Sequence, residues 1–296
     1  MSTLYWILRL QFLQAKISAQ NELKEGSRCR LTRMTDEIIA SNKWYNIFNI
    51  ILKGSFMEKI ILDNGFFLGM GLFETIKVVN RKPILLKEHL NRINNSLKCF
   101  NIDQVIVEDD ITDFIEGHSE ESYALKLSVS EKNKIITTRV DPYNKKTLGE
   151  VRLKFANTIR NSTSTMVYHK TFNYMDNILE KRRAKEEGFF EPIFLNENGY
   201  IAEGAVSNIF FIRNEKMFTP KLSAGILNGV MRSFFINHFD VEEVLIKKED
   251  LDKFDSGFIT NSLMGYVEFD CLGEFNFKRS KITNEFDKEL RKIGFI

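Results

Sequence analysis

Apolar and polar residues recur along the chain with the two periods that distinguish strands from helices. Residues 72–79 read Leu-Phe-Glu-Thr-Ile-Lys-Val-Val, which predicts a strand. Residues 87–100 are predicted to form an amphipathic helix, because apolar side chains repeat there at helical spacing: Leu86, Leu90, Ile93 and Leu97.

Similar elements are predicted on both sides of a polar stretch at residues 142–149, which contains Pro142 and Gly149 and is the best candidate for a domain linker. Before it we expect strands at 57–62, 83–86, 122–130 and 135–140 and a helix at 105–121. After it we expect strands at 151–156, 192–195, 200–202, 208–212, 216–219 and from 258, and helices at 174–187, 230–238 and 284–293. The pattern indicates two domains that both mix helices and strands, at residues 57–141 and 150–296.

Residues 1–56 differ from the rest of the chain. They carry a basic run and an aromatic patch but no motif. The segment Lys53-Gly54-Ser55-Phe56 could be encoded by a purine-rich stretch like a bacterial ribosome-binding site. We therefore expect Met57 to be the natural start of the protein. The alternative is a genuine helical extension at the N-terminus.

The composition is that of a soluble globular protein, with 43% hydrophobic and 28% charged residues among 296. The net charge of +2 indicates no broad surface for nucleic acid. Cys29, Cys99 and Cys271 lie far apart and form no metal-binding pattern, so we expect free thiols in a reducing cytoplasm. The apolar stretch at 4–13 contains Arg9, so no export signal or membrane segment is expected. No glycine-rich motif for nucleoside triphosphates or dinucleotides is present.

Lys170 and Glu203 are the first candidates for chemistry. Lys170 lies just before the predicted helix at 174–187, and Glu203 ends a predicted strand that runs into small and polar residues. A site for a pyridine-type aldehyde cofactor needs an amine to condense with the aldehyde and a carboxylate to keep the ring nitrogen protonated. The pair alone is weak evidence, because both residue types are common.

Two segments could bind the phosphate of such a cofactor. Gly225 and Gly229 bracket a short apolar loop directly before the helix at 230–238, and free amides at a helix start bind anions. A plain helix cap explains this loop equally well. The hydroxyl-rich turn Thr260-Asn261-Ser262 is the second segment.

The sequence leaves the roles of two cationic side chains open. Arg92 lies on a polar face of its predicted helix. A solvated surface charge is the commoner role for such an arginine, and binding of a phosphate is the more specific alternative. Lys126 interrupts an apolar strand, and it faces either water at a sheet edge or a cleft.

Seven motifs that are weak one by one occur in order between Met57 and Phe269: Gly-x-Gly-x-Phe-Glu-Thr from Gly69, Glu88-His89-Leu90-x-Arg92-Ile93, Lys170 with Asn173-Tyr174, Glu203-Gly204-x-x-Ser207-Asn208, Thr219-Pro220, Gly225-Ile226-Leu227-x-Gly229-x-x-Arg232 and Thr260-Asn261-Ser262. In this combination the chain resembles the fold-type IV pyridoxal-phosphate enzymes, which include branched-chain and D-amino-acid aminotransferases and aminodeoxychorismate lyases. The resemblance implies pyridoxal 5'-phosphate as cofactor. It also implies a small α+β domain, a larger β-barrel-like domain with flanking helices, and a homodimer with the cleft between the domains.

The resemblance also implies roles for individual residues. Lys170 would bind the cofactor covalently and shuttle protons, Glu203 would pair with the pyridine nitrogen, and Tyr174 would hydrogen-bond the ring hydroxyl. The phosphate would be held by four groups: the Arg92 side chain, the backbone amides of Val230 and Met231, and the Ser262 hydroxyl. The substrate-facing residues are expected to be Phe73, Lys126 and Leu263.

The Thr260-Asn261-Ser262 turn and the glycine-bracketed loop look most like those of aminodeoxychorismate lyase, which releases pyruvate from 4-amino-4-deoxychorismate and forms 4-aminobenzoate for folate synthesis. That substrate has two carboxylates, and Lys126 is the candidate cation for one of them. The alternative is an aminotransferase of branched-chain or D-amino acids, because the same cofactor site serves both reactions. A cofactor-free binding protein on the same fold is a third possibility, against which the joint presence of Lys170, Glu203 and Arg92 argues.

Two features depart from the family pattern. Met70 stands where the family often has Asp, and the strand that often precedes Asp63 is short or missing if Met57 is the start. Neither departure removes a group that the cofactor needs.

Overall fold

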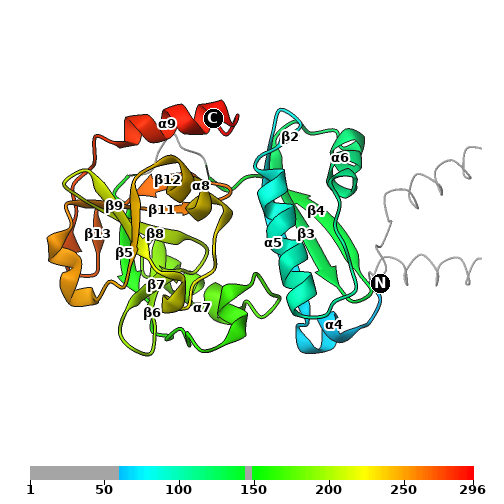
Figure 1. Cartoon of the computed structure of the whole chain (residues 1–296), viewed down its shortest axis with the longest axis horizontal. Helices are drawn as coiled ribbons and strands as arrows, with labels where there is room; N and C mark the ends of the chain where they lie inside the picture. The colour runs from blue at the N-terminus through cyan, green and yellow to red at the C-terminus, as the bar shows by residue number, and fades with distance from the viewer. Residues whose placement is uncertain (1–59, 144–148) are drawn as a thin grey trace, which may run out of the picture. The chain divides into compact units, whose positions relative to one another are not determined.

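The computed structural model describes residues 60–143 and 149–296, and Ile61–Ile296 belongs to one compact unit (Figure 1). The expectations about Met57, an N-terminal extension and Cys29 lie outside the described residues, as does most of the linker expected at 142–149. Cys99 and Cys271 are free thiols. Among the helices of the described residues, none combines the length and the apolar character needed to span a membrane.

The first described element is a short helix, α4 (Asn64–Leu68), where the sequence predicted a strand to end. The Asp63 side chain begins this helix by accepting a hydrogen bond from the Phe66 amide. The side chain of Asn133 bonds both the amide and the carbonyl of Ile61, at 2.8 and 2.9 Å. The predicted strand at 57–62 is therefore wrong for residues 60–62, which belong to no strand, and the Ile61 backbone bonds the Asn133 side chain instead of a neighbouring strand.

A four-stranded antiparallel sheet follows, in the order β2-β1-β3-β4. Its strands are β1 (Gly71–Val79), β2 (Lys82–Pro83), β3 (Tyr123–Ser130) and β4 (Lys134–Arg139). Helices α5 (Leu86–Cys99) and α6 (Glu108–Gly117) cover one face of it. Leu72 and Ile76 point to those helices, so the alternation along β1 turns Phe73 and Thr75 to the opposite face. That second face is the one available for a site.

Two elements in this part are shorter than predicted. The strand expected at 83–86 is limited to the end of β2, because Leu86 already begins α5. The helix expected at 105–121 is limited to α6. The Asn94 side chain bonds both the amide and the carbonyl of Ile106, at 2.9 and 2.8 Å, and so holds the chain before α6 in an extended form.

The remainder of the chain forms two five-stranded sheets. One has the order β14-β13-β5-β6-β7 and the other β10-β9-β8-β11-β12. The strands of the first are β5 (Arg152–Phe155), β6 (Glu191–Leu195), β7 (Ile201–Gly204), β13 (Cys271–Leu272) and β14 (Phe275–Asn276). Those of the second are β8 (Asn208–Arg213), β9 (Lys216–Pro220), β10 (Val241–Val244), β11 (Ser256–Asn261) and β12 (Gly265–Glu268).

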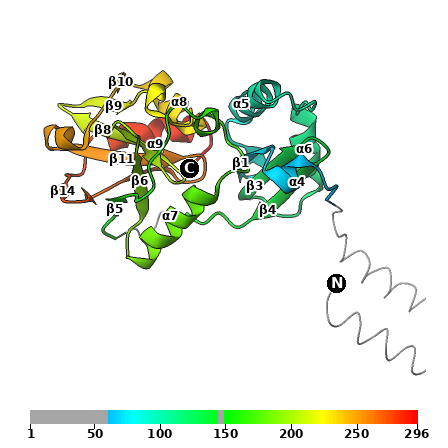
Figure 2. The ribbon, with the colours of Figure 1, turned by 90° about the horizontal axis from the view of Figure 1, so that it is seen from below.

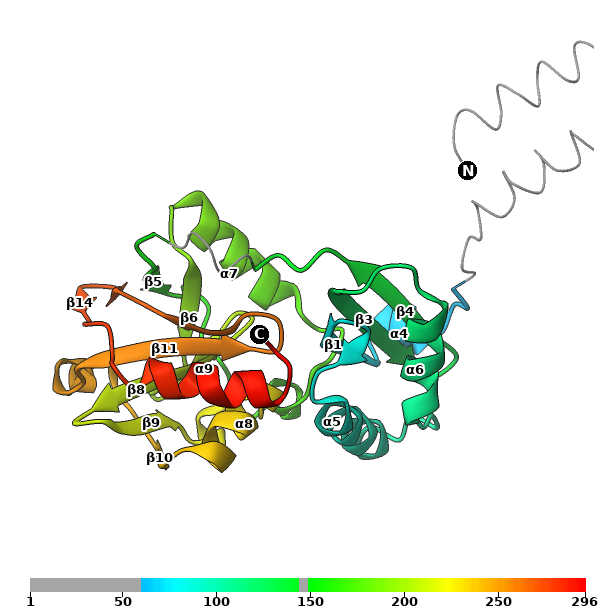
Figure 3. The ribbon, with the colours of Figure 1, turned by 90° about the horizontal axis from the view of Figure 1, so that it is seen from above.

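The two sheets share an apolar core, and helices cover the outer face of the second. Alternation along β8 shows the division: Ile209 and Phe211 join the core between the sheets, whereas Phe210 and Ile212 pack against α8 (Val230–His238) and α9 (Thr283–Lys292). Figure 3 shows α9 lying along β8 and β11. The β-barrel-like architecture with flanking helices that was expected from the resemblance is confirmed.

A crossover joins the parallel strands β5 and β6 and contains Lys170. It comprises a 3-10 helix, η3 (Thr165–Tyr168), and helix α7 (Met175–Glu186), which packs beside β6 (Figure 2). Short 3-10 helices also occur at η4 (Leu222–Ala224) and η5 (Lys248–Lys253). The crossover places Lys170 where the four-stranded sheet meets the rest of the unit.

Candidate active site

A cavity of about 1080 Å³ lies between the open face of the four-stranded sheet and the loops around β7, α7 and α8. It brings together every residue that the sequence predicted for the site: Phe73, Arg92, Lys126, Lys170, Tyr174, Glu203, Val230, Met231, Ser262 and Leu263. Their individual roles stay predictions, but Lys170 and Glu203 share one cavity, as a common ligand requires.

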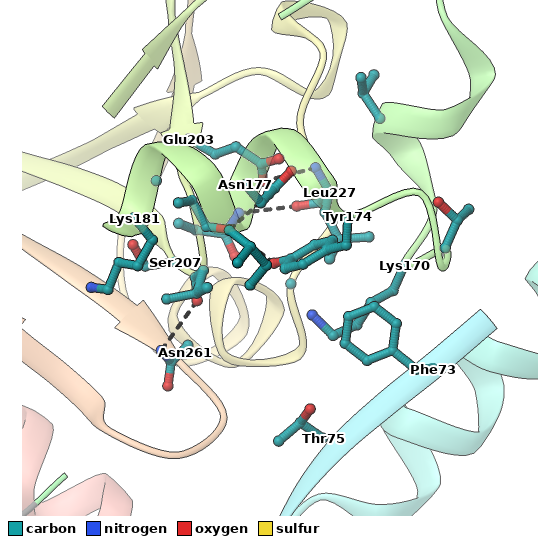
Figure 4. Close-up of a pocket in the computed structure, with 18 of the residues that line it drawn as sticks. Phe73, Thr75, Lys170, Tyr174, Asn177, Lys181, Glu203, Ser207, Leu227 and Asn261 are labelled. Atoms are coloured by element: carbon teal, nitrogen blue, oxygen red, sulfur yellow. Dashed lines mark hydrogen bonds between the residues drawn. The ribbon is translucent and has the colours of Figure 1, made fainter. Parts of the chain in front are cut away.

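The backbone around Lys170 is bonded to the start of β1. The Phe73 amide donates to the Lys170 carbonyl at 2.9 Å, and the Phe172 amide donates to the Gly71 carbonyl at 2.8 Å. The Lys170 amine lies 4.5 Å from the centroid of the Phe73 ring and 5.3 Å from that of Tyr174 (Figure 4). Burial, and then the positive charge of Arg92, lowers its pKa to about 8. A larger fraction of this amine is therefore neutral and nucleophilic near pH 7 than is usual for lysine.

Glu203 lies at the inner end of β7 and is 7% exposed. Its carboxylate accepts hydrogen bonds from Arg160 at 3.2 Å and from the Leu227 amide at 3.1 Å. Burial raises the pKa of Glu203 to about 7, and Arg160 offsets only part of that effect. This carboxyl group can therefore gain or lose a proton near neutral pH.

Arg160 is a site residue that the sequence reasoning missed. Its guanidinium stacks on the Phe194 ring at 4.0 Å and also donates to the Asn177 side chain at 3.1 Å. It lies in a loop of hydroxyl and amide residues with no periodicity, so the sequence held no signal that this arginine reaches inward.

Tyr174 is held by the turn that follows Glu203. Its hydroxyl donates to the Ala205 carbonyl at 2.8 Å, and Asn177 donates to the same carbonyl at 2.7 Å. Burial raises the pKa of Tyr174, so the phenol stays protonated. Since its proton is directed to Ala205, the hydroxyl oxygen remains an acceptor toward the cavity.

A buried carboxylate, Glu191, fixes the shape of that turn. It accepts hydrogen bonds from the Val206 amide at 2.7 Å and from the Ser207 hydroxyl at 3.0 Å, and it is paired with Lys181. A side chain at Gly204 would place its Cβ 2.2 Å from the Ser207 hydroxyl oxygen. The turn is therefore specific for glycine at this position.

Helix α8 begins at the cavity with Gly229 as its N-cap residue. The Ser233 amide makes the first helical bond, to the Gly229 carbonyl at 2.9 Å, so the amides of Val230 and Met231 precede the helical bonding pattern. A Cβ on Gly229 would lie 1.9 Å from the Asn208 amide oxygen. Ser262 lies in a turn nearby, where the Asn261 side chain accepts from the amides of Leu263 and Met264, both at 2.9 Å. These groups suit an anion such as phosphate.

Arg92 is oriented by Glu74, a second residue whose role the sequence reasoning missed. The guanidinium donates to Glu74 at 2.7 and 2.6 Å and to the Asn228 carbonyl at 3.2 Å, and His89 contacts Glu74 at 2.7 Å. Burial would raise the pKa of Glu74, but Arg92 and His89 outweigh it and lower the pKa to about 2. A guanidinium has five N–H groups, so two of those on Arg92 remain available for an anion. An acid inside the apolar strand β1 was the signal for this role.

The four-stranded sheet supplies the wall opposite Tyr174. The rings of Phe73 and Tyr174 meet edge to face, with centroids 5.2 Å apart. The Lys126 amine lies 4.8 Å from the centroid of the same Phe73 ring. Leu263 is buried, and its carbonyl accepts a hydrogen bond from Lys77 at 3.0 Å. Lys126 therefore faces the cleft, which was one of the two orientations left open by the sequence.

Comparisons with known proteins agree with this geometry. The family model described as amino-transferase class IV matches residues 71–269. The chain is 27% identical to an aminodeoxychorismate lyase of Bacillus subtilis, over 77% of this chain and 88% of that protein. It is also 27% identical to a probable branched-chain-amino-acid aminotransferase of Thermotoga maritima, over 74% of this chain and 85% of that protein.

Among solved structures, a putative 4-amino-4-deoxychorismate lyase from Legionella pneumophila is similar to this fold. Its TM-score is 0.73 at 26% identity, and the match covers 81% of this chain and 97% of that chain. The matched family model covers the strands that carry Phe73 and Glu203 and the loops that carry Lys170 and Ser262. The chain belongs to the class IV aminotransferase family of fold-type IV.

Proposed function

We propose that this protein is a pyridoxal-phosphate-dependent 4-amino-4-deoxychorismate lyase, which releases pyruvate and forms 4-aminobenzoate for folate synthesis. The observation that carries the proposal is the position of two amines on one ring. The Lys170 and Lys126 nitrogens lie 4.5 and 4.8 Å from the centroid of Phe73. A second cation this close to the reactive lysine suits a substrate that carries a carboxylate in addition to its amine.

The residues present fit pyridoxal phosphate. Lys170 offers an amine with no hydrogen-bond partner among the described residues, and Glu203 offers a buried carboxyl group on the other side of Tyr174 in the view of Figure 4. Arg92, Ser262 and the start of α8 would hold the phosphate. When bound, the cofactor withdraws electrons from the carbon that bears the substrate amine.

The reaction needs a proton to be moved twice. One proton leaves the amine-bearing ring carbon, the C–O bond to the enolpyruvyl group breaks, and the released enol takes up a proton to become pyruvate. The Lys170 amine, with its lowered pKa, acts as the base and then as the acid. Glu203 keeps the pyridine nitrogen protonated, and Lys126 binds one of the two carboxylates of the substrate.

The alternative is an aminotransferase of branched-chain or D-amino acids. The identity with the Thermotoga maritima protein favours it, and nothing in Lys170, Glu203 or the start of α8 distinguishes the two reactions. The distinction lies in the walls of the substrate pocket.

We further propose that the protein is a cytoplasmic homodimer. Helix α4 exposes three large apolar side chains, since Phe66, Phe67 and Leu68 are 62%, 64% and 63% exposed. Adjacent apolar residues at such exposure are typical of a subunit interface. The free thiols of Cys99 and Cys271 suit a reducing compartment.

One experiment separates the two reactions. Purified protein loaded with pyridoxal phosphate is mixed with aminodeoxychorismate, and pyruvate and 4-aminobenzoate are measured. A parallel sample is mixed with leucine or D-alanine alone, and the cofactor absorbance is followed. A lyase forms both products and changes its absorbance slowly with amino acids. Rapid bleaching by an amino acid without pyruvate release would show an aminotransferase. Lys170→Ala is the inactive control for both assays.

A further inference from the structure

Among the described residues, the lysine and arginine side chains that line the cavity are paired with carboxylates, with two exceptions besides Lys170. Three of the cavity-lining cations each bond a carboxylate: Arg92 bonds Glu74, Arg160 bonds Glu203 and Lys181 bonds Glu191. Lys126 and Arg139 also line the cavity, and in the described residues neither has a hydrogen bond or ion pair with an acid. These two charges are therefore left to a ligand or to water.

Strand register places Lys126 and Arg139 on one face of the sheet. Lys126 is opposite Thr137 and Arg139 is opposite Ala124, so the two cations are diagonal neighbours across β3 and β4. Diagonal neighbours in an antiparallel pair lie roughly 7–8 Å apart, within reach of one small anion for side chains of this length. Thr75 is opposite Lys126 on β1, which puts the pair on the same face as Phe73 and toward the reactive lysine.

The pair repels itself in the absence of an anion. Burial, and then the charge of Arg139, lowers the pKa of Lys126. A carboxylate between the two groups would relieve that repulsion, and the planar guanidinium of Arg139 matches a carboxylate in shape. The acids that line the cavity, Asp176 and Glu203, come from α7 and β7 and not from this sheet.

We propose that Lys126 and Arg139 together form a carboxylate subsite, which binds the carboxylate of the substrate that lies away from the reacting amine. The subsite rests on the proposed function in that Lys170 receives the amine, and it selects amines that carry two carboxylates over amino acids with an apolar side chain. Arg139 is thereby a specificity-determining residue, and it lies outside every motif that the sequence analysis singled out.

The test is a binding measurement that needs no turnover. Benzene-1,3-dicarboxylate and its monoamide, 3-carbamoylbenzoate, have the same shape and differ by one charge. Their affinities for the enzyme loaded with pyridoxal phosphate are measured by calorimetry at low salt. We expect the dicarboxylate to bind about tenfold more tightly, because the free energy of one charge-assisted hydrogen bond is enough for such a difference in affinity. Lys126→Gln and Arg139→Gln should each remove most of that preference.

Lys98→Gln is the matched control, because Lys98 is an exposed cation on α5 and does not line the cavity. It should keep the preference of the wild-type protein. A wild-type protein that binds both probes equally, or an Arg139→Gln variant that keeps the preference, would overturn the subsite. If the preference depends on both residues but aminodeoxychorismate yields no pyruvate, the subsite stands and the lyase assignment fails. If pyruvate is released but the Arg139→Gln variant keeps the preference for the dicarboxylate, the lyase assignment stands and the subsite fails.

Discussion

Arg92 donates two hydrogen bonds to the Glu74 carboxylate, from Nε at 2.7 Å and from a terminal nitrogen at 2.6 Å. Helix α5 carries the arginine and strand β1 carries the acid, which is 1% exposed. The ion pair therefore fixes the guanidinium plane relative to the sheet. Its remaining N–H groups are oriented before any anion binds, which reduces the entropy lost on binding.

Replacing Glu74 by glutamine should weaken binding of the phosphate more than binding of the ring. Glutamine keeps one acceptor but removes the charge that orients Arg92. We expect Glu74→Gln to lower the affinity for pyridoxal phosphate about tenfold and to leave that for pyridoxal, which has no phosphate, nearly unchanged. The free energy of unfolding should fall by about 1–3 kcal/mol. Glu88→Gln, at an exposed position of helix α5, which also carries Arg92, is the control. Equal losses for both ligands would contradict this role.

The pH dependence of cofactor capture should report the lowered pKa of Lys170. Only the neutral amine attacks an aldehyde, and the pKa of this amine is about 8 instead of 10.5. We expect the rate of covalent capture by cofactor-free protein, trapped with borohydride, to rise with pH to a midpoint near 8. Lys170→Ala should show no capture at this site by peptide mass mapping. A midpoint near 10.5 would mean that the amine is not desolvated.

Glu203 should make the cofactor-free protein less stable as pH rises. The folded state raises the pKa of this carboxyl group from 4.5 to about 7, so between these values the folded state binds more protons than the unfolded state. Stability due to this group is complete below pH 4.5 and is lost as pH rises through 7. The shift corresponds to about 3 kcal/mol at most. Urea unfolding of Glu203→Gln should therefore lack this loss, and parallel curves for both proteins would refute the assignment.

The start of α8 should not tolerate a side chain at Gly229. A Cβ there would lie 1.9 Å from the Asn208 amide oxygen, so either that side chain or the helix start must move. We expect Gly229→Ala to cost about 1–3 kcal/mol of folding free energy and to weaken pyridoxal phosphate binding at least as strongly. Gly117→Ala meets no atom within 4 Å and should be neutral in both measurements.

The sequence predicted best what depends on local periodicity. Helix α8 begins and ends at the predicted residues, Val230 and His238, because an N-cap glycine and a run of apolar residues mark it. Strand β1 was also recognised from its apolar alternation. The family motifs identified residues that the fold brings into one cavity, although they lie on different sheets and helices.

What the sequence missed depends on contacts between distant segments. Arg160 bonds Glu203 across 43 residues, and Arg139 acquires its position from strand register rather than from a motif. The Asn133 side chain bonds the Ile61 backbone in place of a neighbouring strand, and no local sequence pattern reveals that contact. Such side-chain bonds to the backbone are set by tertiary structure, so they override the local preference for a strand.

Strand β2 pairs only with Val78 and Val79, which leaves the beginning of β1 with a free edge, and the segment that carries Lys170 bonds to that edge. The backbones of Lys170 and Phe73 are therefore held together by a direct hydrogen bond. Changes in β1 that widen the cavity would therefore also displace Lys170. Divergence of specificity should accordingly favour substitutions on β3 and β4, which can be altered without disturbing the backbone that carries Lys170.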